Sequence, residues 1–260
     1  MKRKAALFTI VRDEPIFLPI WERYYTKYFD ACDIYILDNQ SSDPTTLGIA
    51  KKYNRLRIYN ETVDYFWLTN TAKEFQKFLL QSYEYVLYTD CDEIIFTNPE
   101  KTKLGLRDYI NFTKQTAIGS QGFELVHDTA NEPKLDLNSG ILNQRHYIHE
   151  SQVYSKTLLS KTPLEWAPGF HTIENIPETS KVIKKDLILI HLHRMDFDLA
   201  WQKCQYLSTQ KWGTECIEKG AGYQNRISDI KEFEEWFYND FHDGRPFNPE
   251  MIPASWLGLI

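Results

Sequence analysis

The chain of 260 residues is 42% hydrophobic and 25% charged, which is typical of a folded globular protein and excludes a disordered or low-complexity chain. With 30 Lys and Arg against 36 Asp and Glu, its net charge of −6 argues against a nucleic-acid-binding protein. The 4 cysteines form no Cys-x-x-Cys pair, which argues against zinc fingers or a disulfide framework and predicts a reducing, cytoplasmic compartment.

Apolar runs and helical patterns alternate in the first part of the chain. The run at residues 5–11 is continuous, as in a strand covered on both faces. Charged residues follow it at once, so we interpret it as a strand and not as the core of a signal peptide. The alternation predicts an α/β fold with a doubly wound, mostly parallel central sheet flanked by helices. We expect strands at residues 5–11, 34–37, 56–59 and 85–89, and helices at residues 16–28, 45–53 and 70–83.

The second half of the chain has a less regular pattern. It contains neither an internal repeat nor a linker, so we expect two packed halves of one unit. Its last helix carries Phe233, Trp236, Phe237 and Phe241 on one face, and the neighbouring glutamates favour core packing or an oligomer contact over a membrane surface. We expect helices at residues 105–112, 197–211 and 230–241, strands at residues 116–126, 154–159 and 182–191, and a loop at residues 132–140.

Acidic and polar residues follow three of the predicted parallel strands, at the edge of the sheet where ligands bind in this class of fold. Asp90 and Asp92 come directly after the strand at residues 85–89. Two carboxylates at this spacing suit Mg²⁺ or Mn²⁺, which take oxygen ligands from the protein and from substrate phosphates. The alternative is a solvated turn at the end of a strand, because Asp-x-Asp alone is common.

Three segments in this order resemble a known family. FTIVRDEPIFLPIWERYY, CDIYILDNQSSDPT and YVLYTDCDEIIF are similar to the start of GT-A fold glycosyltransferases, in particular the family-2-like and family-92-like group. The resemblance covers residues 5–100 and extends more weakly to PGFHTI and IHLHR. It assigns residues 1–215 to a glycosyltransferase domain, with a nucleotide-binding half at about 1–100 and an acceptor half at about 101–215. Residues 216–260 are then a C-terminal helical extension packed on it.

The resemblance implies roles for residues at the matching positions. Asp90 and Asp92 are implied to hold the metal that bridges the donor diphosphate, where a divalent cation stabilises the charge of the leaving group. Glu93 is expected to orient these ligands from behind. The nucleotide is expected to contact the ends of the first two strands, at Thr9, Val11, Arg12, Glu14, Asp38 and Asn39.

Histidines near the end of the predicted strand at residues 182–191 add to the expected site. His191 and His193 are two residues apart, so both face the cleft if the strand is regular. We rank His193 first as a third metal ligand because it lies further towards the carboxyl end. His171, in a Gly-containing loop, and Arg194 are expected to contact the diphosphate. The alternative for all four is packing or surface exposure.

A base on the acceptor side is the least determined part of the expected site. The family-2 resemblance implies an inverting transfer, which requires a group that takes the proton of the acceptor hydroxyl. Asp128 and Glu124, in GSQGFELVHDTA, are the candidates, with Asp128 slightly favoured. The chain lacks the Glu-Asp dipeptide found in many family-2 members, so the resemblance does not choose between them.

The leading hypothesis is therefore a metal-dependent glycosyltransferase of surface polysaccharide synthesis, with Mn²⁺ or Mg²⁺ as cofactor. Its expected partners are a nucleotide-sugar donor and a glycan or glycolipid acceptor, without nucleic acid. Peripheral association with the inner face of a membrane and self-association stay open. One alternative is a nucleotidyltransferase, although VRDEP lacks the Gly-rich phosphate loop of that class. The other is a catalytically silent carbohydrate-binding or scaffold protein.

Overall fold

The computed structural model describes residues 2–175, 183–239 and 248–260. Its first half has the strand–helix alternation predicted from the sequence, and the fold class is confirmed as α/β. The elements are β1 (Arg3–Val11), α1 (Phe17–Tyr25), β2 (Ile34–Asn39), α2 (Pro44–Ala50), β3 (Asn54–Ile58), α3 (Tyr65–Leu79) and β4 (Tyr83–Tyr88).

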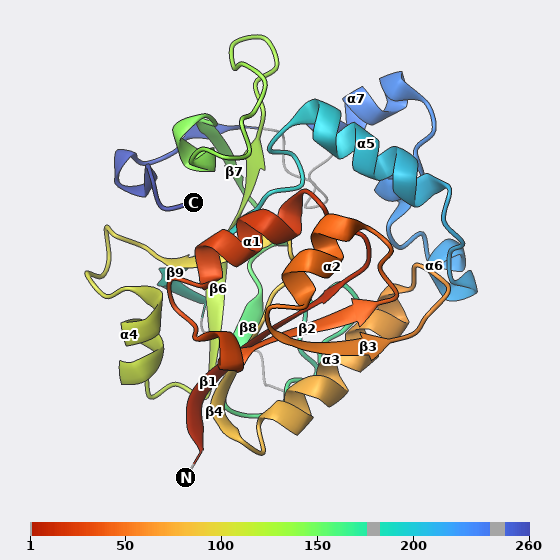
Figure 1. Cartoon of the computed structure of the whole chain (residues 1–260). Coiled ribbons are helices and arrows are strands. Elements are labelled where there is room, and N and C mark those ends of the chain that lie inside the picture. Colours follow the sequence, from red (N-terminus) through yellow and green to blue (C-terminus); the bar gives the residue numbers. More distant parts are fainter. Residues whose placement is uncertain (1, 176–182, 240–247) are drawn as a thin grey trace.

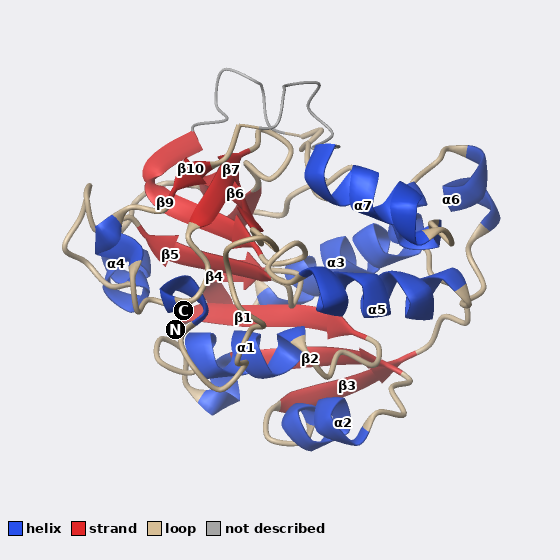
Figure 2. Cartoon of the chain, turned by 90° about the horizontal axis from the view of Figure 1, so that it is seen from above, coloured by secondary structure: helices blue, strands red, loops and turns tan. Residues whose placement is uncertain are grey.

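The strands of this half form a parallel sheet in the order β3-β2-β1-β4. Figures 1 and 2 show α1 and α2 on one face of these strands and α3 on the other. The register pairs Val11 with Asp38 and Phe8 with Tyr88, so the carboxyl ends of β1, β2 and β4 meet at one edge. This edge is where the sequence predicts a ligand site.

Helix α3 begins five residues earlier than its apolar pattern predicts. The Asp64 carboxylate accepts hydrogen bonds from the backbone N–H groups of Phe66 and Trp67, which caps the helix at its N-terminus. The helix ends at Leu79, and Tyr83, which the apolar pattern predicts as the end of this helix, begins β4. This early start matters for the site because it brings Asp64 and Tyr65 to the edge where the strands end.

The second half adds strands beyond β4, most of them antiparallel. Strand β8 (Thr157–Ser160) pairs with β4, and β6 (Ala117–Val126) pairs with β8 and with β7 (Tyr147–Glu150), which carries the short β10 (Glu250–Met251). Strand β9 (Ile183–His191) lies parallel to β6 and antiparallel to β5 (Glu93–Thr97). The register sets His191 opposite both Glu93 and Glu124. Strands β5, β7 and β10 are not predicted by the sequence patterns.

Short helices complete the chain. They are α4 (Leu106–Phe112), α5 (Phe197–Ser208), α6 (Thr214–Glu218) and α7 (Ile230–Asn239), with the 3₁₀ turns η1 (Ala31–Asp33), η2 (Ile141–Asn143), η4 (Tyr223–Arg226) and η5 (Ala254–Trp256). The apolar face of α7 packs against α5, as expected for a core contact, while Phe241 and Val182 lie outside the described residues. Within the described ranges, no helix combines the length and the apolar character needed to cross a membrane.

Candidate active site

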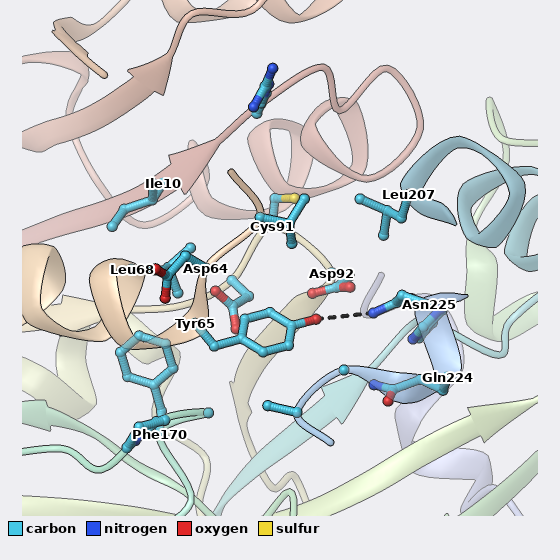
Figure 3. Close-up of a pocket in the computed structure, with 18 of the residues that line it drawn as sticks. Ile10, Asp64, Tyr65, Leu68, Cys91, Asp92, Phe170, Leu207, Gln224 and Asn225 are labelled. Carbon is cyan, nitrogen blue, oxygen red and sulfur yellow. Dashed lines mark hydrogen bonds between the residues drawn. The ribbon is translucent and has the colours of Figure 1, made fainter. Parts of the chain in front are cut away.

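A cavity of about 610 Å³ opens at the edge of the sheet where β1 and β4 end. Its walls come from distant parts of the sequence (Figure 3): the ends of these strands, the start of α3, the loop around Phe170, helix α5, and residues 220–225. The expected C-terminal extension, residues 216–260, therefore contributes part of the cavity wall through residues 220–225. Of the expected site residues, the cavity is lined by Val11, Arg12, Glu14, Asn39, Asp90, Asp92, Glu93, His171, His191 and His193.

Asp90 lies in the short link between β4 and β5, and its carboxylate accepts a hydrogen bond from the Tyr88 hydroxyl. The end of β4 is anchored from behind, since Trp21 Nε1 donates to Thr89 Oγ1 at 2.7 Å in the core. Burial, with the nearby charge of Glu93, raises the pKa of Asp90 to about 7. A bound cation would therefore stabilise the ionised form of Asp90.

Asp92 is held by cationic groups. Its Oδ2 atom lies 3.3 Å from Lys203 Nζ on α5 and 3.7 Å from His191 Nε2. Burial opposes its ionisation, but the charges of Lys203 and His191 outweigh burial in sum and lower the pKa of Asp92. Lys203 Nζ also lies 3.1 Å from Glu14 Oε1, so one lysine links the loop after β1 to the loop after β4.

Behind His191 lies Glu124, whose side chain is 0% exposed. Its carboxylate lies 3.0 Å from His191 Nδ1 and accepts a hydrogen bond from the backbone N–H of Arg194 at 3.3 Å. The His191 ring stacks on Tyr154, with ring centroids 4.3 Å apart. Burial alone would lower the pKa of His191, but the charges of Glu124 and Asp92 raise it. The result is a chain of contacts from Glu124 through His191 to Asp92.

His193 lines the cavity without a hydrogen-bond partner for its buried Nε2 atom, and it is 7% exposed. Burial, with the positive charge of His191, lowers its pKa to about 3, so the ring is neutral at physiological pH. A neutral imidazole with an unpaired nitrogen is a competent metal ligand. Among the described residues, no three His, Cys, Asp or Glu side chains are arranged to hold a metal ion by themselves, and a metal site at Asp90, Asp92 and His193 stays a prediction.

Two lysines and two polar residues that line the cavity are not among the site residues predicted from the sequence. Lys156 Nζ lies 2.5 Å from Glu93 Oε1 and is almost fully buried. It stands inside the expected strand at residues 154–159, where a single lysine does not indicate a site. Lys203 does carry a signal, since it stands on the apolar face of the predicted helix at residues 197–211. Tyr65 and Asn225 are brought together only by the tertiary fold.

Arg12, Asn39 and His171 reach the cavity, but protein groups occupy part of their hydrogen-bonding capacity. Arg12 donates to the carbonyls of Asn60 and Glu61, and the Asn39 amide exchanges hydrogen bonds with the backbone of Asn60. The exposed His171 ring lies 2.6 Å from the Val153 carbonyl through Nδ1. These contacts fix the three side chains at the rim and leave the remaining guanidinium N–H groups of Arg12 for other partners.

Five of the expected site residues do not line the cavity: Thr9, Asp38, Glu124, Asp128 and Arg194. Thr9 is fully buried within β1. The Asp128 carboxylate accepts hydrogen bonds from Ala130 N–H and from the Asn131 amide, so it stabilises its own turn. Arg194 is buried against the Trp236 ring and donates to two carbonyls of α7, so it anchors that helix.

Asp38 also makes contacts that stabilise the fold. Its fully buried carboxylate lies 2.5 Å from the Arg55 guanidinium of β3 and accepts a hydrogen bond from Ser41 N–H. Burial alone would raise its pKa, but the Ser41 hydrogen bonds and Arg55 lower it below the ordinary value. The expected contact with a nucleotide is therefore replaced by a structural ion pair.

A prediction follows for the stability of an Asp38→Asn variant. At pH 7 we expect a loss of about 2 kcal/mol in the free energy of unfolding, since Arg55 loses its charged partner but is partly solvated. Because the pKa of Asp38 is lowered in the folded state, this contribution is complete above about pH 4 and is lost as the pH falls further. Urea denaturation at pH 7 and pH 3 measures both values. An equal difference at the two pH values would contradict this interpretation, and Asp30→Asn, which breaks an exposed pair with Arg107, is the control.

No known family model matches the sequence, and no curated protein matches it. Solved structures with a similar arrangement include a mannosyltransferase, PcManGT from Pyrobaculum calidifontis, in complex with GDP-Man and Mn²⁺, with a TM-score of 0.40 and 9% identity over 92% of this chain and 70% of that chain. Another is TarS of S. aureus, with a TM-score of 0.33 and 14% identity over 91% of this chain and 78% of that chain. These likenesses concern the fold alone.

Proposed function

We propose that this chain transfers a sugar from a nucleotide-diphosphate sugar to an acceptor hydroxyl, in the manner of family-2-like or family-92-like glycosyltransferases. The observation that carries the proposal is the placement of Asp90 and Asp92 at the carboxyl end of β4, inside a cavity large enough for such a donor. Surface polysaccharide synthesis, with a glycan or lipid-linked acceptor, is the setting that we propose for it.

The charges of the cavity favour a donor that binds together with a divalent cation. Among the described residues that line it, 5 are carboxylates (Glu14, Asp64, Asp90, Asp92 and Glu93) and 3 are Lys or Arg (Arg12, Lys156 and Lys203). A bare diphosphate would meet an excess of negative charge. A diphosphate neutralised by Mn²⁺ or Mg²⁺ would not, because a divalent cation held by these carboxylates would offset the negative charge of the phosphates.

Asp90 and Asp92 are the residues that would hold this cation. Two carboxylates suffice when the donor phosphates and water supply the other ligands, so the absence of a three-residue cluster among the described residues fits this kind of site. His193, with its unpaired Nε2, is available to the cation or to a phosphate oxygen. When bound, the cation acts as a Lewis acid that stabilises the leaving diphosphate.

The other residues of the cavity position these groups. Lys203 holds Asp92 and Glu14 in place, and Lys156 balances Glu93 behind the acidic pair. Arg12, at the end of β1, is the cation that we assign to the nucleotide. Neither Asp128 nor Glu124 is placed to contact an acceptor, so the proposal assigns neither as the base, and the inverting course is tested separately by the anomeric configuration of the product.

Thermal denaturation with ligands tests the proposal. We expect UDP- or GDP-linked hexoses with Mn²⁺ to raise the melting temperature by about 5 °C at 100 times the dissociation constant, and to do so much less when EDTA replaces Mn²⁺. Release of the nucleoside diphosphate is then measured in the same samples. A shift without release in the presence of acceptor glycans would indicate a silent binding protein. Shifts with nucleoside triphosphates but not with nucleotide sugars would indicate a nucleotidyltransferase.

A further inference from the structure

One wall of the cavity is built by residues 220–225, far in sequence from the acidic pair. At its end lies Asn225, whose amide Nδ2 donates to the Tyr65 hydroxyl at 3.0 Å, as the dashed line in Figure 3 shows. Both residues line the cavity. This contact joins the C-terminal segment to the start of α3 across the site.

The backbone around Asn225 is tightly fixed. Gly222 has a positive φ of 67°, and a Cβ atom at this position would lie 2.5 Å from Tyr65 Cε2, so the segment packs directly onto the tyrosine ring. Helix α5 holds the other side, because the Cys204 thiol donates to the Gln224 carbonyl at 3.2 Å. Asn225 N–H donates to the Gly222 carbonyl at 3.0 Å. The position of the Asn225 side chain is therefore set by the fold before any ligand binds.

Asn225 has an acceptor that the protein leaves unused. The residue is 5% exposed, and its Oδ1 atom has no hydrogen-bond partner. Buried carbonyl oxygens are nearly always paired, so an orphan on the wall of a cavity marks a place where a ligand supplies the donor. In this arrangement Nδ2 is engaged with the Tyr65 hydroxyl, so Oδ1 is the atom of the amide that is left for a ligand.

The neighbouring Tyr65 hydroxyl places this acceptor close to the acidic pair. Burial, followed by the negative charges of Asp90 and Asp92, raises the pKa of Tyr65 to about 12, so the hydroxyl is neutral in the physiological range. Tyr65 and Asn225 line the same cavity as Asp90 and Asp92, the residues that we assign to the diphosphate (Figure 3). A donor whose diphosphate binds at the acidic pair therefore has room to place a flanking group beside Asn225 in the same cavity.

We propose that Asn225 Oδ1 accepts a hydrogen bond from a hydroxyl of the donor next to its diphosphate, and so selects a hydroxylated ring at this position. Phosphate oxygens carry no proton to donate at neutral pH, which leaves the ring hydroxyls of the two groups that flank the diphosphate. These are the transferred sugar and the ribose, which share this chemistry. The inference rests on the proposed function and adds a specificity residue to it.

The test is a double-mutant cycle between the protein and the donor. Binding is measured by calorimetry for the wild type and Asn225→Leu, with the UDP- or GDP-hexose that the wild type binds, its monodeoxy-hexose analogues, and its 2′- and 3′-deoxyribose analogues. In the wild type we expect removal of one hydroxyl to weaken binding about tenfold. In Asn225→Leu the same removal should change the affinity less than about twofold, since its partner is already absent.

Each outcome of the cycle is decisive. Coupling to a hexose hydroxyl assigns Asn225 to the transferred sugar, and coupling to a ribose hydroxyl assigns it to the nucleoside. An equal cost of every deoxy analogue in both proteins, or unchanged binding of the parent donor by Asn225→Leu, would overturn the inference while leaving the proposed function standing. A wild type that binds no nucleotide sugar would overturn both. Asn111→Leu, the same change at an exposed position of α4, is the matched control, and the melting temperatures of all variants report on folding.

Discussion

Replacement of Asp92 by asparagine is expected to reduce Mn²⁺-dependent sugar transfer by about 10³-fold, because a neutral amide oxygen binds a hard divalent cation much more weakly than a charged carboxylate. The fold should survive the change. Lys203 keeps Glu14 as a partner at 3.1 Å, and His191 keeps Glu124 at 3.0 Å, so no buried cation is left alone. Because the lowered pKa of Asp92 reflects its attraction to Lys203 and His191, we expect the variant to lose about 2 kcal/mol of unfolding free energy, a loss that still leaves it folded.

The measurements are the initial rate of transfer as a function of Mn²⁺ concentration and the urea denaturation curve. Asp108→Asn, the same change at an exposed position in the first turn of α4, should leave both as in the wild type. Full activity of Asp92→Asn with an unchanged Mn²⁺ dependence would show that the acidic pair is a solvated turn and would remove the central support of the proposed function. Loss of activity together with unfolding would be seen in the denaturation curve.

The arrangement of the first half of the chain could be predicted because its signals are local. Continuous apolar runs, a proline at the start of a helix and turn residues at strand ends are each visible in a short window of sequence, and they recover β1, α1, β2 and β4. The parallel order of these strands then places Asp90, Asp92 and Arg12 at one edge without further information. The same reasoning does not predict β5, because its sequence, EIIF, directly follows Asp90 and Asp92 and no turn-forming residues mark the start of a new strand.

The roles of the conspicuous polar residues could not be predicted in this way. In the sequence, Asp38 and Arg194 stand near the ends of predicted strands, as Asp90 does. In the structure, Asp38 forms an ion pair with Arg55, and Arg194 donates hydrogen bonds to carbonyls of α7. Whether a charged side chain faces a ligand or a partner in the fold depends on which distant element covers it. Tyr65 and Asn225 show the converse, since neither stands out in the sequence and their contact spans 160 residues.

Replacement of Glu124 by glutamine is expected to reduce turnover by about 10–100-fold, although Glu124 does not line the cavity. The carboxylate is fully buried and contacts His191, which lies 3.0 Å from it on one side and 3.7 Å from Asp92 on the other. The neutral amide no longer favours the charged ring, so Asp92 loses a cationic neighbour and its defined orientation. We therefore propose that Glu124 positions the acidic pair through His191 instead of taking the acceptor proton.

Destabilisation of the fold would also lower activity, so the measurement must distinguish loss of folded protein from loss of the position of Asp92. If Glu124 acts through His191, the double variant Glu124→Gln/His191→Asn should lose no more turnover than His191→Asn alone, whereas independent roles would give multiplied losses.

Glu132→Gln is the matched control, because Glu132 is another buried carboxylate that bonds a histidine, His146, but lies outside the main cavity. We expect both single variants to lose about 2–3 kcal/mol of unfolding free energy, since each leaves buried partners without their charge. Only Glu124→Gln should lose turnover at a temperature where both are folded, and equal turnover losses in the two variants would reduce Glu124 to a part of the core.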